Sequence, residues 1–182
     1  MRFIAAFAAP LLVLAACAPE AEEAEAPAED AAAAEPAEDA TLDLQATGIV
    51  VPAQNGYEQL EVPFGSMRAA TEATLGNLLG EPVQVVTQNP DDCQLSSVQY
   101  EGLIVNYADD QFVGYVASAP YVPDIDRASM LADPGVEFVE GSTLGEEFAI
   151  GSGNATISGL FAGEGDDAAV EALWAGENCI FR

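Results

Sequence analysis

Four pairs of adjacent carboxylates are the residues of this sequence whose types and spacing could support chemistry. Two carboxyl groups can perform acid–base catalysis when one of them has a raised pKa in an apolar pocket. Adjacent residues of a strand point to opposite faces, however, and exposed acids in turns keep ordinary pKa values. We therefore expect no catalytic residue among them. The pairs, which all fall at expected turns or strand starts, are Asp91-Asp92, Asp109-Asp110, Glu146-Glu147 and Asp166-Asp167.

The chain lacks the residue types on which most other catalytic sites depend. It has no histidine and no lysine, which excludes Ser-His and Cys-His pairs, imidazole metal sites and Schiff bases. Residues 163–167, Gly-Glu-Gly-Asp-Asp, could offer oxygen ligands to Ca²⁺, but they lack the ligand spacing of an EF-hand and fit a solvated acidic turn. We expect a protein that is not an enzyme and that has no cofactor and no metal site.

The first seventeen residues have the character of an export signal. An apolar run covers residues 3–13, and it is too short for a membrane-spanning helix. Leu14-Ala15-Ala16-Cys17 follows, with two small side chains directly before the cysteine. This tract resembles the lipobox of bacterial lipoproteins. The resemblance implies that residues 1–16 are a signal peptide and that Cys17 receives a diacylglycerol thioether before cleavage.

The residues after Cys17 bear on where such a lipoprotein would be held. In that family an aspartate directly after the cysteine favours retention in the inner membrane, whereas Ala18 and Pro19 follow here. The resemblance therefore implies a lipid anchor in the outer membrane, facing the periplasm or the cell surface. The alternative is an ordinary cleaved secretory signal with an incidental cysteine.

Residues 18–40 consist almost wholly of alanine, glutamate, aspartate and proline. Nine of them are acidic and none is basic, so like charges repel along the tract. Three prolines interrupt any helix, and no bulky apolar side chain is present to form a core. We expect residues 17–40, beginning with the lipidated cysteine, to form a disordered tether that holds a folded domain off the membrane.

Residues 41–182 are long enough for a single globular domain with one core. They contain 22 acidic residues, and their only cations are Arg68, Arg127 and Arg182, so their net charge is −19. Such a charge repels nucleic acid and anionic lipid headgroups and attracts basic partners or divalent cations. The alternative is that the acidic residues only keep the domain soluble.

The remaining two cysteines form an even pair once lipidation has used Cys17. An exported protein folds in an oxidising compartment, so we predict a disulfide between Cys93 and Cys179 rather than two free thiols. Closing a loop of nearly ninety residues would stabilise the fold by roughly 4–5 kcal/mol in the chain-entropy model.

One convincing helix is predicted between Ser66, a plausible N-cap, and Gly80, at the C-cap position. Pro82 follows, as is typical after a helix. A second, short helix is expected within residues 125–132. In the main helix, one face at helical spacing carries Met67, Thr71, Thr74, Leu75, Leu78 and Leu79.

Short apolar runs separated by turns predict an antiparallel sheet over the rest of the domain. Residues 42–51 and 60–64 are expected to form an extended lead-in and a first strand, and Ile180 and Phe181 a closing strand. The fold class is α+β, with one main helix packed on a sheet of two meanders and one disulfide. Whether the meanders are an internal duplication stays open. Residues 83–87 are β-rich, and the expected strands are then residues 98–100, 103–107 and 112–118 in the first meander, and 136–140, 146–151, 155–162 and 168–174 in the second.

Some segments of the domain resemble a group of small uncharacterised bacterial envelope proteins. They are Val62-Pro63-Phe64-Gly65, Leu79-Gly80-Glu81-Pro82 and the ending at residues 172–182. Some members carry the label aspartate-semialdehyde dehydrogenase, but this chain lacks Gly-x-Gly-x-x-Gly and histidine, so we expect no such activity. Residues 65–118, a helix ending in Leu-Gly-x-Pro before an antiparallel sheet, are similar to the small lipoproteins that support outer-membrane β-barrel assembly.

These features predict an outer-membrane lipoprotein whose acidic domain acts through protein contacts or envelope structure and does not bind nucleic acid. The expected partners are the membrane, reached through the lipid on Cys17, and an envelope protein. The alternative from another class is a carboxylate-dependent hydrolase, or a periplasmic module that binds a small ligand or a cation.

Overall fold

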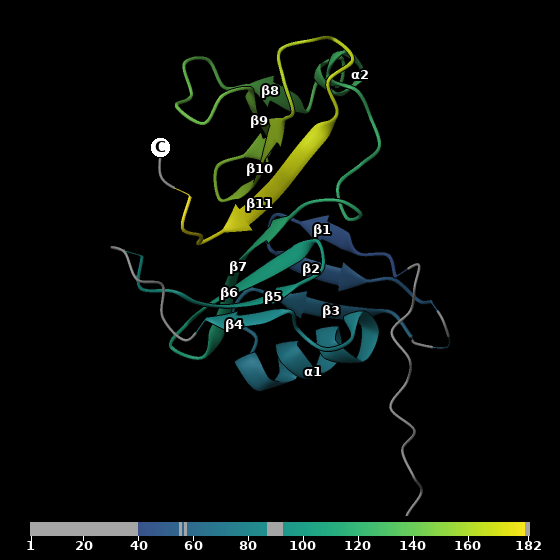
Figure 1. The fold of residues 1–182 in the computed structure, drawn as a ribbon, viewed down its shortest axis with the longest axis vertical. Helices are drawn as coiled ribbons and strands as arrows, with labels where there is room; N and C mark the ends of the chain where they lie inside the picture. The colour runs from purple at the N-terminus through teal and green to yellow at the C-terminus, as the bar shows by residue number, and fades with distance from the viewer. Residues whose placement is uncertain (1–39, 55, 57, 87–92, 181–182) are drawn as a thin grey trace, which may run out of the picture. The chain divides into compact units, whose positions relative to one another are not determined.

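A computed structural model describes residues 40–54, 56, 58–86 and 93–180, which form two antiparallel sheets and two helices (Figure 1). The three-stranded sheet has the order β1-β2-β3, and the eight-stranded sheet has the order β4-β5-β6-β7-β11-β10-β9-β8. In this part of the chain no helix is long and apolar enough to cross a membrane. The elements are β1 (Asp43–Gln45), β2 (Gly48–Val51), β3 (Leu60–Pro63), α1 (Arg68–Leu79), β4 (Gln84–Val86), β5 (Ser96–Tyr100), β6 (Leu103–Ala108), β7 (Gln111–Ala117), α2 (Arg127–Leu131), β8 (Val136–Phe138), β9 (Glu147–Ser152), β10 (Ala155–Phe161) and β11 (Val170–Gly176).

The main helix is confirmed, with a correction at its start. Thr71, Leu75 and Leu78 face the core at helical spacing, and Gly80 ends α1 with a φ of 82°. The N-cap residue is Met67, whose side chain is 61% exposed, and no side chain caps the helix. The expected N-cap, Ser66, instead donates its hydroxyl hydrogen to the Pro63 carbonyl oxygen at 2.7 Å, because the chain enters the helix one residue later.

The disulfide is also confirmed, since Cys93 and Cys179 are bonded with their Cα atoms 5.6 Å apart. The closing strand is wrong. The last strand, β11, lies in the middle of the large sheet, between β7 and β10, and ends at Gly176, whose φ of 72° turns the chain out of the strand. Ile180 is outside any strand, and Phe181 lies outside the described residues.

The expectation of a single sheet made of two meanders is only partly met. Consecutive neighbours do run from β4 to β7 and from β8 to β11, but β1, β2 and β3 form a second sheet. The segment expected as an extended lead-in is a tight hairpin, in which Gln45 pairs with Gly48. Ile49, Val51 and Val62 from this small sheet join the core cluster beneath α1.

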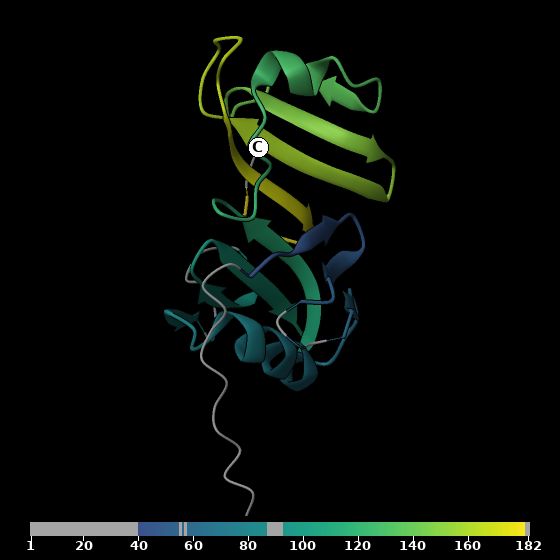
Figure 2. The ribbon, with the colours of Figure 1, turned by 90° about the vertical axis from the view of Figure 1, so that its right-hand side faces the viewer.

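The strand register shows that the large sheet consists of two equivalent halves. The first is α1 with β4–β7 and the second is α2 with β8–β11, and Figures 1 and 2 show each helix against its own four strands. The halves meet at β7 and β11, where Val116 pairs with Trp174. On either side of this pair the register matches, because Tyr115 pairs with Ala175 and Ala117 with Leu173. A pseudo-twofold axis therefore passes through the Val116–Trp174 pair.

An irregularity in the sheet repeats under the same symmetry. The register between β6 and β7 shifts between Asn106 and Tyr107, and that between β10 and β11 shifts between Leu160 and Phe161. With the pairing of Val116 and Trp174 as reference, Asn106 corresponds to Leu160 and Tyr107 to Phe161. The two halves thus share strand order and the position of a register shift.

Candidate functional site

The three carboxylate pairs that the structure describes lie at separate places in the fold. Asp109-Asp110 occupies the turn between β6 and β7, and both residues are exposed with positive φ. Asp166-Asp167 is exposed before β11. Asp91-Asp92, like the proposed lipidation site Cys17, lies outside the described residues. Over the described part of the chain, no three His, Cys, Asp or Glu residues are grouped so that they could hold a metal ion.

The pair Glu146-Glu147 is divided between the two faces of the sheet, as strand alternation predicts. Glu146 Oε2 forms an ion pair with Arg127 Nη2 at 2.9 Å. Glu147 is only 1% exposed and accepts a hydrogen bond of 2.6 Å from the Ser142 hydroxyl group. That bond ties the loop between β8 and β9 to the sheet, so these carboxylates position structure and do not face each other.

The large sheet has a covered face and an open face. The covered face packs on α1, α2 and the small sheet through two clusters of buried side chains. Residues between these core positions point to the open face, because side chains alternate along each strand. One row of them, which we call the central row, crosses all eight strands. From β4 to β8 the register partners in the central row are Gln84, Gln99, Ile104, Val116, Trp174, Ser158, Ala149 and Glu137.

The central row is apolar in the middle and polar at both ends. Ile104 and Val116 are half-buried, and Trp174, the chain's only tryptophan, is 5% exposed. At the ends of the row, Gln84 and Glu137 are exposed. Trp174 is therefore covered by other parts of the chain, whereas Ile104 and Val116 leave an accessible apolar area between polar groups, a combination found on binding surfaces.

Two segments cover the open face on either side of the central row. Residues 177–180 cross the sheet beside Gly114, where a Cβ atom would collide with the Glu177 backbone. Asn106 Nδ2 donates a hydrogen bond of 3.4 Å to the Glu177 carbonyl oxygen, and the disulfide at Cys179 fastens the segment. The loop between β8 and β9 lies over Glu147 on the other side. The central row is therefore bordered on both sides by segments that are fixed to the sheet.

A cavity of about 700 Å³ opens between the sheet and the C-terminal segment. Trp174, Thr156 and Ser158 line it from the sheet, and Cys93, Asn178 and Ile180 line it from the disulfide-linked segments. It offers an aromatic side chain beside hydroxyl and amide groups, which suits a partner that is itself partly apolar and partly polar.

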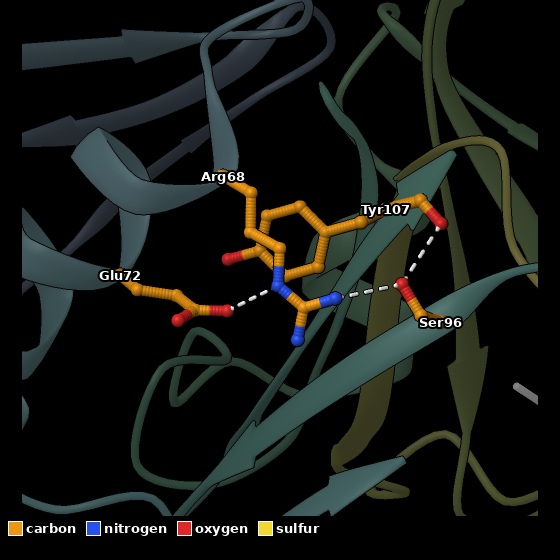
Figure 3. Close-up of polar contacts among 4 residues, drawn as sticks. All are labelled: Arg68, Glu72, Ser96 and Tyr107. Atoms are coloured by element: carbon orange, nitrogen blue, oxygen red, sulfur yellow. Dashed lines mark hydrogen bonds and ion pairs between the residues drawn. The ribbon is translucent and has the colours of Figure 1, made fainter. Parts of the chain in front are cut away.

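The two described arginines stand on the covered face, each as the first residue of a helix. Arg68 Nε donates to Glu72 Oε1 at 2.6 Å and Nη1 donates to Ser96 Oγ at 3.0 Å (Figure 3). The Arg68 guanidinium carbon lies 4.8 Å from the centroid of the Tyr107 ring (Figure 3). Burial, reinforced by the Glu72 carboxylate, raises the pKa of Tyr107 above its ordinary value, so this ring stays neutral.

Arg127 repeats this arrangement in the second half. It pairs with Glu146 and lies 5.8 Å from the centroid of the Phe161 ring, which corresponds to Tyr107. A second ring, that of Phe138, lies 5.2 Å away. Both arginines thus fasten a helix to the sheet, and their charges are matched by neighbouring carboxylates.

Sequence reasoning did not find the central row, although each of its eight residues lies in an expected strand or in the β-rich residues 83–87. Trp174, which is flanked by the apolar residues Leu173 and Ala175, is buried. Only the register, which puts Leu173 and Ala175 opposite core residues of β7, shows that Trp174 points the other way.

Searches of protein-family models, of curated proteins and of solved structures found nothing that matches this chain.

Proposed function

We propose that this protein is an outer-membrane lipoprotein whose acidic domain binds another envelope protein and catalyses no reaction. The sequence supports the anchor, through the tract Leu14-Ala15-Ala16-Cys17 and the acidic residues that follow. The structure supports a binding role through the central row, in which the apolar residues Ile104 and Val116 are half-buried. The absence of histidine and lysine from the sequence supports a function without catalysis.

The central row is the observation that carries the proposal. An antiparallel sheet can leave one face to water, and such a face then alternates with polar side chains. Here its middle is instead Ile104, Val116 and Trp174, three apolar residues on three neighbouring strands. Rigid strands hold these side chains at fixed spacing, so a partner could dock without ordering a loop.

The anchor is tested by replacing the cysteine that would carry the lipid. Cys17→Ser should release the mature protein into the soluble periplasmic fraction, because two or more acyl chains are needed for stable attachment. Intact-mass measurement should show the loss of the acyl groups from the wild-type mass. An unchanged mass together with unchanged membrane fractionation would refute lipidation.

The binding role is tested by crosslinking in intact cells. A photo-crosslinking residue is placed at exposed and half-exposed positions over the described surface, one per variant, and crosslinked proteins are identified by mass spectrometry. We expect at least one position to capture an envelope protein reproducibly. If no position captures any protein, the interaction role is wrong.

The cavity under the disulfide-linked segments favours a second candidate function, the binding of a small ligand. Its 700 Å³ lie within the range of ligand pockets, and Trp174 is part of its lining. The fluorescence of this single tryptophan should then change in a saturable way when the low-mass fraction of a periplasmic extract is added. No change with that fraction, together with protein crosslinks, favours the first function.

A further inference from the structure

The surface around the central row has an unbalanced negative charge. Arg68 and Arg127 are both engaged by carboxylates on the covered face, with side chains 22% and 19% exposed. Within the described residues no other cation exists, whereas the exposed acids include Glu61, Glu101, Glu137 and Glu171. The field over the open face is therefore negative, and paired arginines do not relieve it.

Carboxylates also stand at the margins of the open face itself. Glu137 ends the central row at β8 and is exposed. Glu177 is exposed at the start of the segment that crosses the face, held there by its N–H, which donates to the Val113 carbonyl oxygen at 2.8 Å. An apolar middle is thus combined with acidic margins.

We propose that the envelope protein bound by this domain presents a cationic segment that lies along the central row, with apolar and basic side chains both facing the sheet. This inference rests on the proposed binding function and adds the site and the chemistry of the partner. Apolar side chains of the segment would contact the half-buried Ile104 and Val116, and its lysines or arginines would face Glu137 and Glu177.

The length of the row sets the length of the segment. Eight strands leave seven gaps of about 4.8 Å, so the row is roughly 34 Å long. An extended chain advances about 3.3 Å per residue, so about ten residues would span it. Such a segment contacts the face of the sheet and adds no strand to its edge.

The negative charge of the domain also argues against two other binding partners at the central row. A second copy of this domain would bring net charges of −19 together, and an anionic lipid surface would be repelled in the same way. A basic protein segment gains from the same field, which raises its association rate and makes binding dependent on salt.

The test uses the full chain in intact cells, with a photo-crosslinking residue at one of three positions. Gln99 and Ala149 are equivalent positions in the two halves of the central row, both half-exposed. Ala73 is exposed on α1, the helix that packs on the covered face, and serves as the matched control. We expect capture of one protein at Gln99 and at Ala149 but not at Ala73, through a crosslinked peptide rich in lysine and arginine.

Charge variants then test the chemistry. Ala149→Arg puts a cation on the open face beside Glu137, so it should lower capture from position 99 by about tenfold or more, because like charges oppose a basic partner. Ala73→Arg makes the same change of charge on α1 and should leave capture within about twofold. Gln99→Arg, with capture read from position 149, repeats the test should Ala149→Arg prevent folding.

The outcomes separate this inference from the function on which it rests. Capture of a protein at Ala73 or elsewhere, but not at Gln99 and Ala149, would leave the binding function standing and overturn the site. Capture at the central row through a neutral or acidic peptide, or capture that Ala149→Arg and Gln99→Arg leave unchanged, would overturn the cationic partner. No capture at any position would overturn the binding function itself.

Discussion

The first half of the large sheet, α1 with β4–β7, and the second half, α2 with β8–β11, place an arginine in the same way. In each half the arginine begins the helix, and its backbone N–H donates to a carbonyl oxygen just before the last strand, Asp110 for Arg68 and Ala168 for Arg127, both at 2.8 Å. On the open face the halves differ, because Asn106 corresponds to Leu160 and Val116 to Trp174. On the covered face core packing keeps the side chains of both halves predominantly apolar, whereas on the open face a polar residue can correspond to an apolar one.

At one pair of positions on the covered face, a larger side chain on one strand is compensated by a smaller residue on the neighbouring strand. In the first half Val98 is paired with Val105, and in the second half the equivalent pair is Phe148 with Gly159. A Cβ atom on Gly159 would lie 2.2 Å from the Phe148 ring. Each pair fills the space between its two strands, with two valines in the first half and with a phenylalanine opposite a glycine in the second, as close packing requires.

The two helices differ most in how completely their apolar side chains are buried. Replacing a core residue of each helix by alanine should therefore have the largest effect on stability. Leu75→Ala in α1 should lower the free energy of unfolding by about 3–5 kcal/mol, because this side chain is fully buried. Met130→Ala in α2 should cost about 2 kcal/mol, because Met130 is 8% exposed in a smaller cluster. Urea denaturation of the mature chain measures both. Equal losses would mean that the halves contribute equally to stability.

High pH should destabilise the first half selectively. Its core holds Tyr100, Tyr107 and Tyr115, whose equivalents in the second half, Ile150, Phe161 and Leu173, do not titrate. Burial, helped by the Glu72 carboxylate, raises the pKa of Tyr100 to about 12, and burial also raises the pKa of the other two. The folded state therefore keeps protons that the unfolded state loses above pH 10, so stability is present below pH 10 and falls as the pH rises towards 12.

A matched pair of variants tests which tyrosine causes the loss of stability at high pH. The Tyr107 hydroxyl group is buried without a hydrogen-bond partner, so Tyr107→Phe, which copies the second half, should not lower stability at pH 7 and should reduce the loss at high pH. The Tyr115 hydroxyl group donates to the Gln45 carbonyl oxygen at 3.1 Å, so Tyr115→Phe should cost about 1 kcal/mol at pH 7. Denaturation midpoints between pH 7 and 11 give both results. An unchanged alkaline profile in Tyr107→Phe would contradict the assignment.

The exchange of volume between the halves predicts a rescue. Gly159→Val alone should destabilise the protein by about 1–3 kcal/mol, because the added atoms meet the Phe148 ring. Phe148→Val alone should also destabilise it, by leaving a cavity. Combined, the two changes recreate the Val98–Val105 pair and should cost less than either change alone. Additive losses in the double variant would show that the halves are not equivalent at this position.

Periodicity predicted what depends on local pattern. The helical spacing of Thr71, Leu75 and Leu78 and the alternation of Leu103, Val105 and Tyr107 gave the main helix and much of the first meander. The parity of the cysteines gave the disulfide between Cys93 and Cys179. Each of these features can be predicted from the chemistry or the spacing of the residues that form it.

Features that depend on pairing between distant strands were not predictable in this way. The contact of β7 with β11 makes the pseudo-twofold axis, and it joins residues nearly sixty positions apart that share no sequence signal. The position of Trp174 on the open face follows only from that pairing. The small sheet was missed because β1 and β3 are too short, at three and four residues, to show alternation.

The N-cap residues of the two helices differ, and this difference predicts the smallest change in stability. Asp126 caps α2 by accepting a hydrogen bond of 2.7 Å from the Ser129 backbone N–H, which lowers the pKa of this carboxyl group. Met67 occupies the same position in α1 with φ −61° and ψ 136°, the extended conformation that an N-cap requires, but its side chain caps nothing. Met67→Asp should therefore raise the free energy of unfolding by about 0.5–1 kcal/mol at pH 7.

The pH dependence of that gain identifies its cause. A capping carboxylate has a depressed pKa in the folded state, so its contribution is present above the unfolded pKa near 4 and is lost as the pH falls below it. Met67→Asn can cap without a charge and should keep most of its gain at low pH. Chemical denaturation of both variants at pH 7 and at pH 3 separates the two contributions. If neither variant gains stability at pH 7, then the start of α1 is held by Arg68 and its contacts with the sheet, and a side-chain cap adds nothing to it.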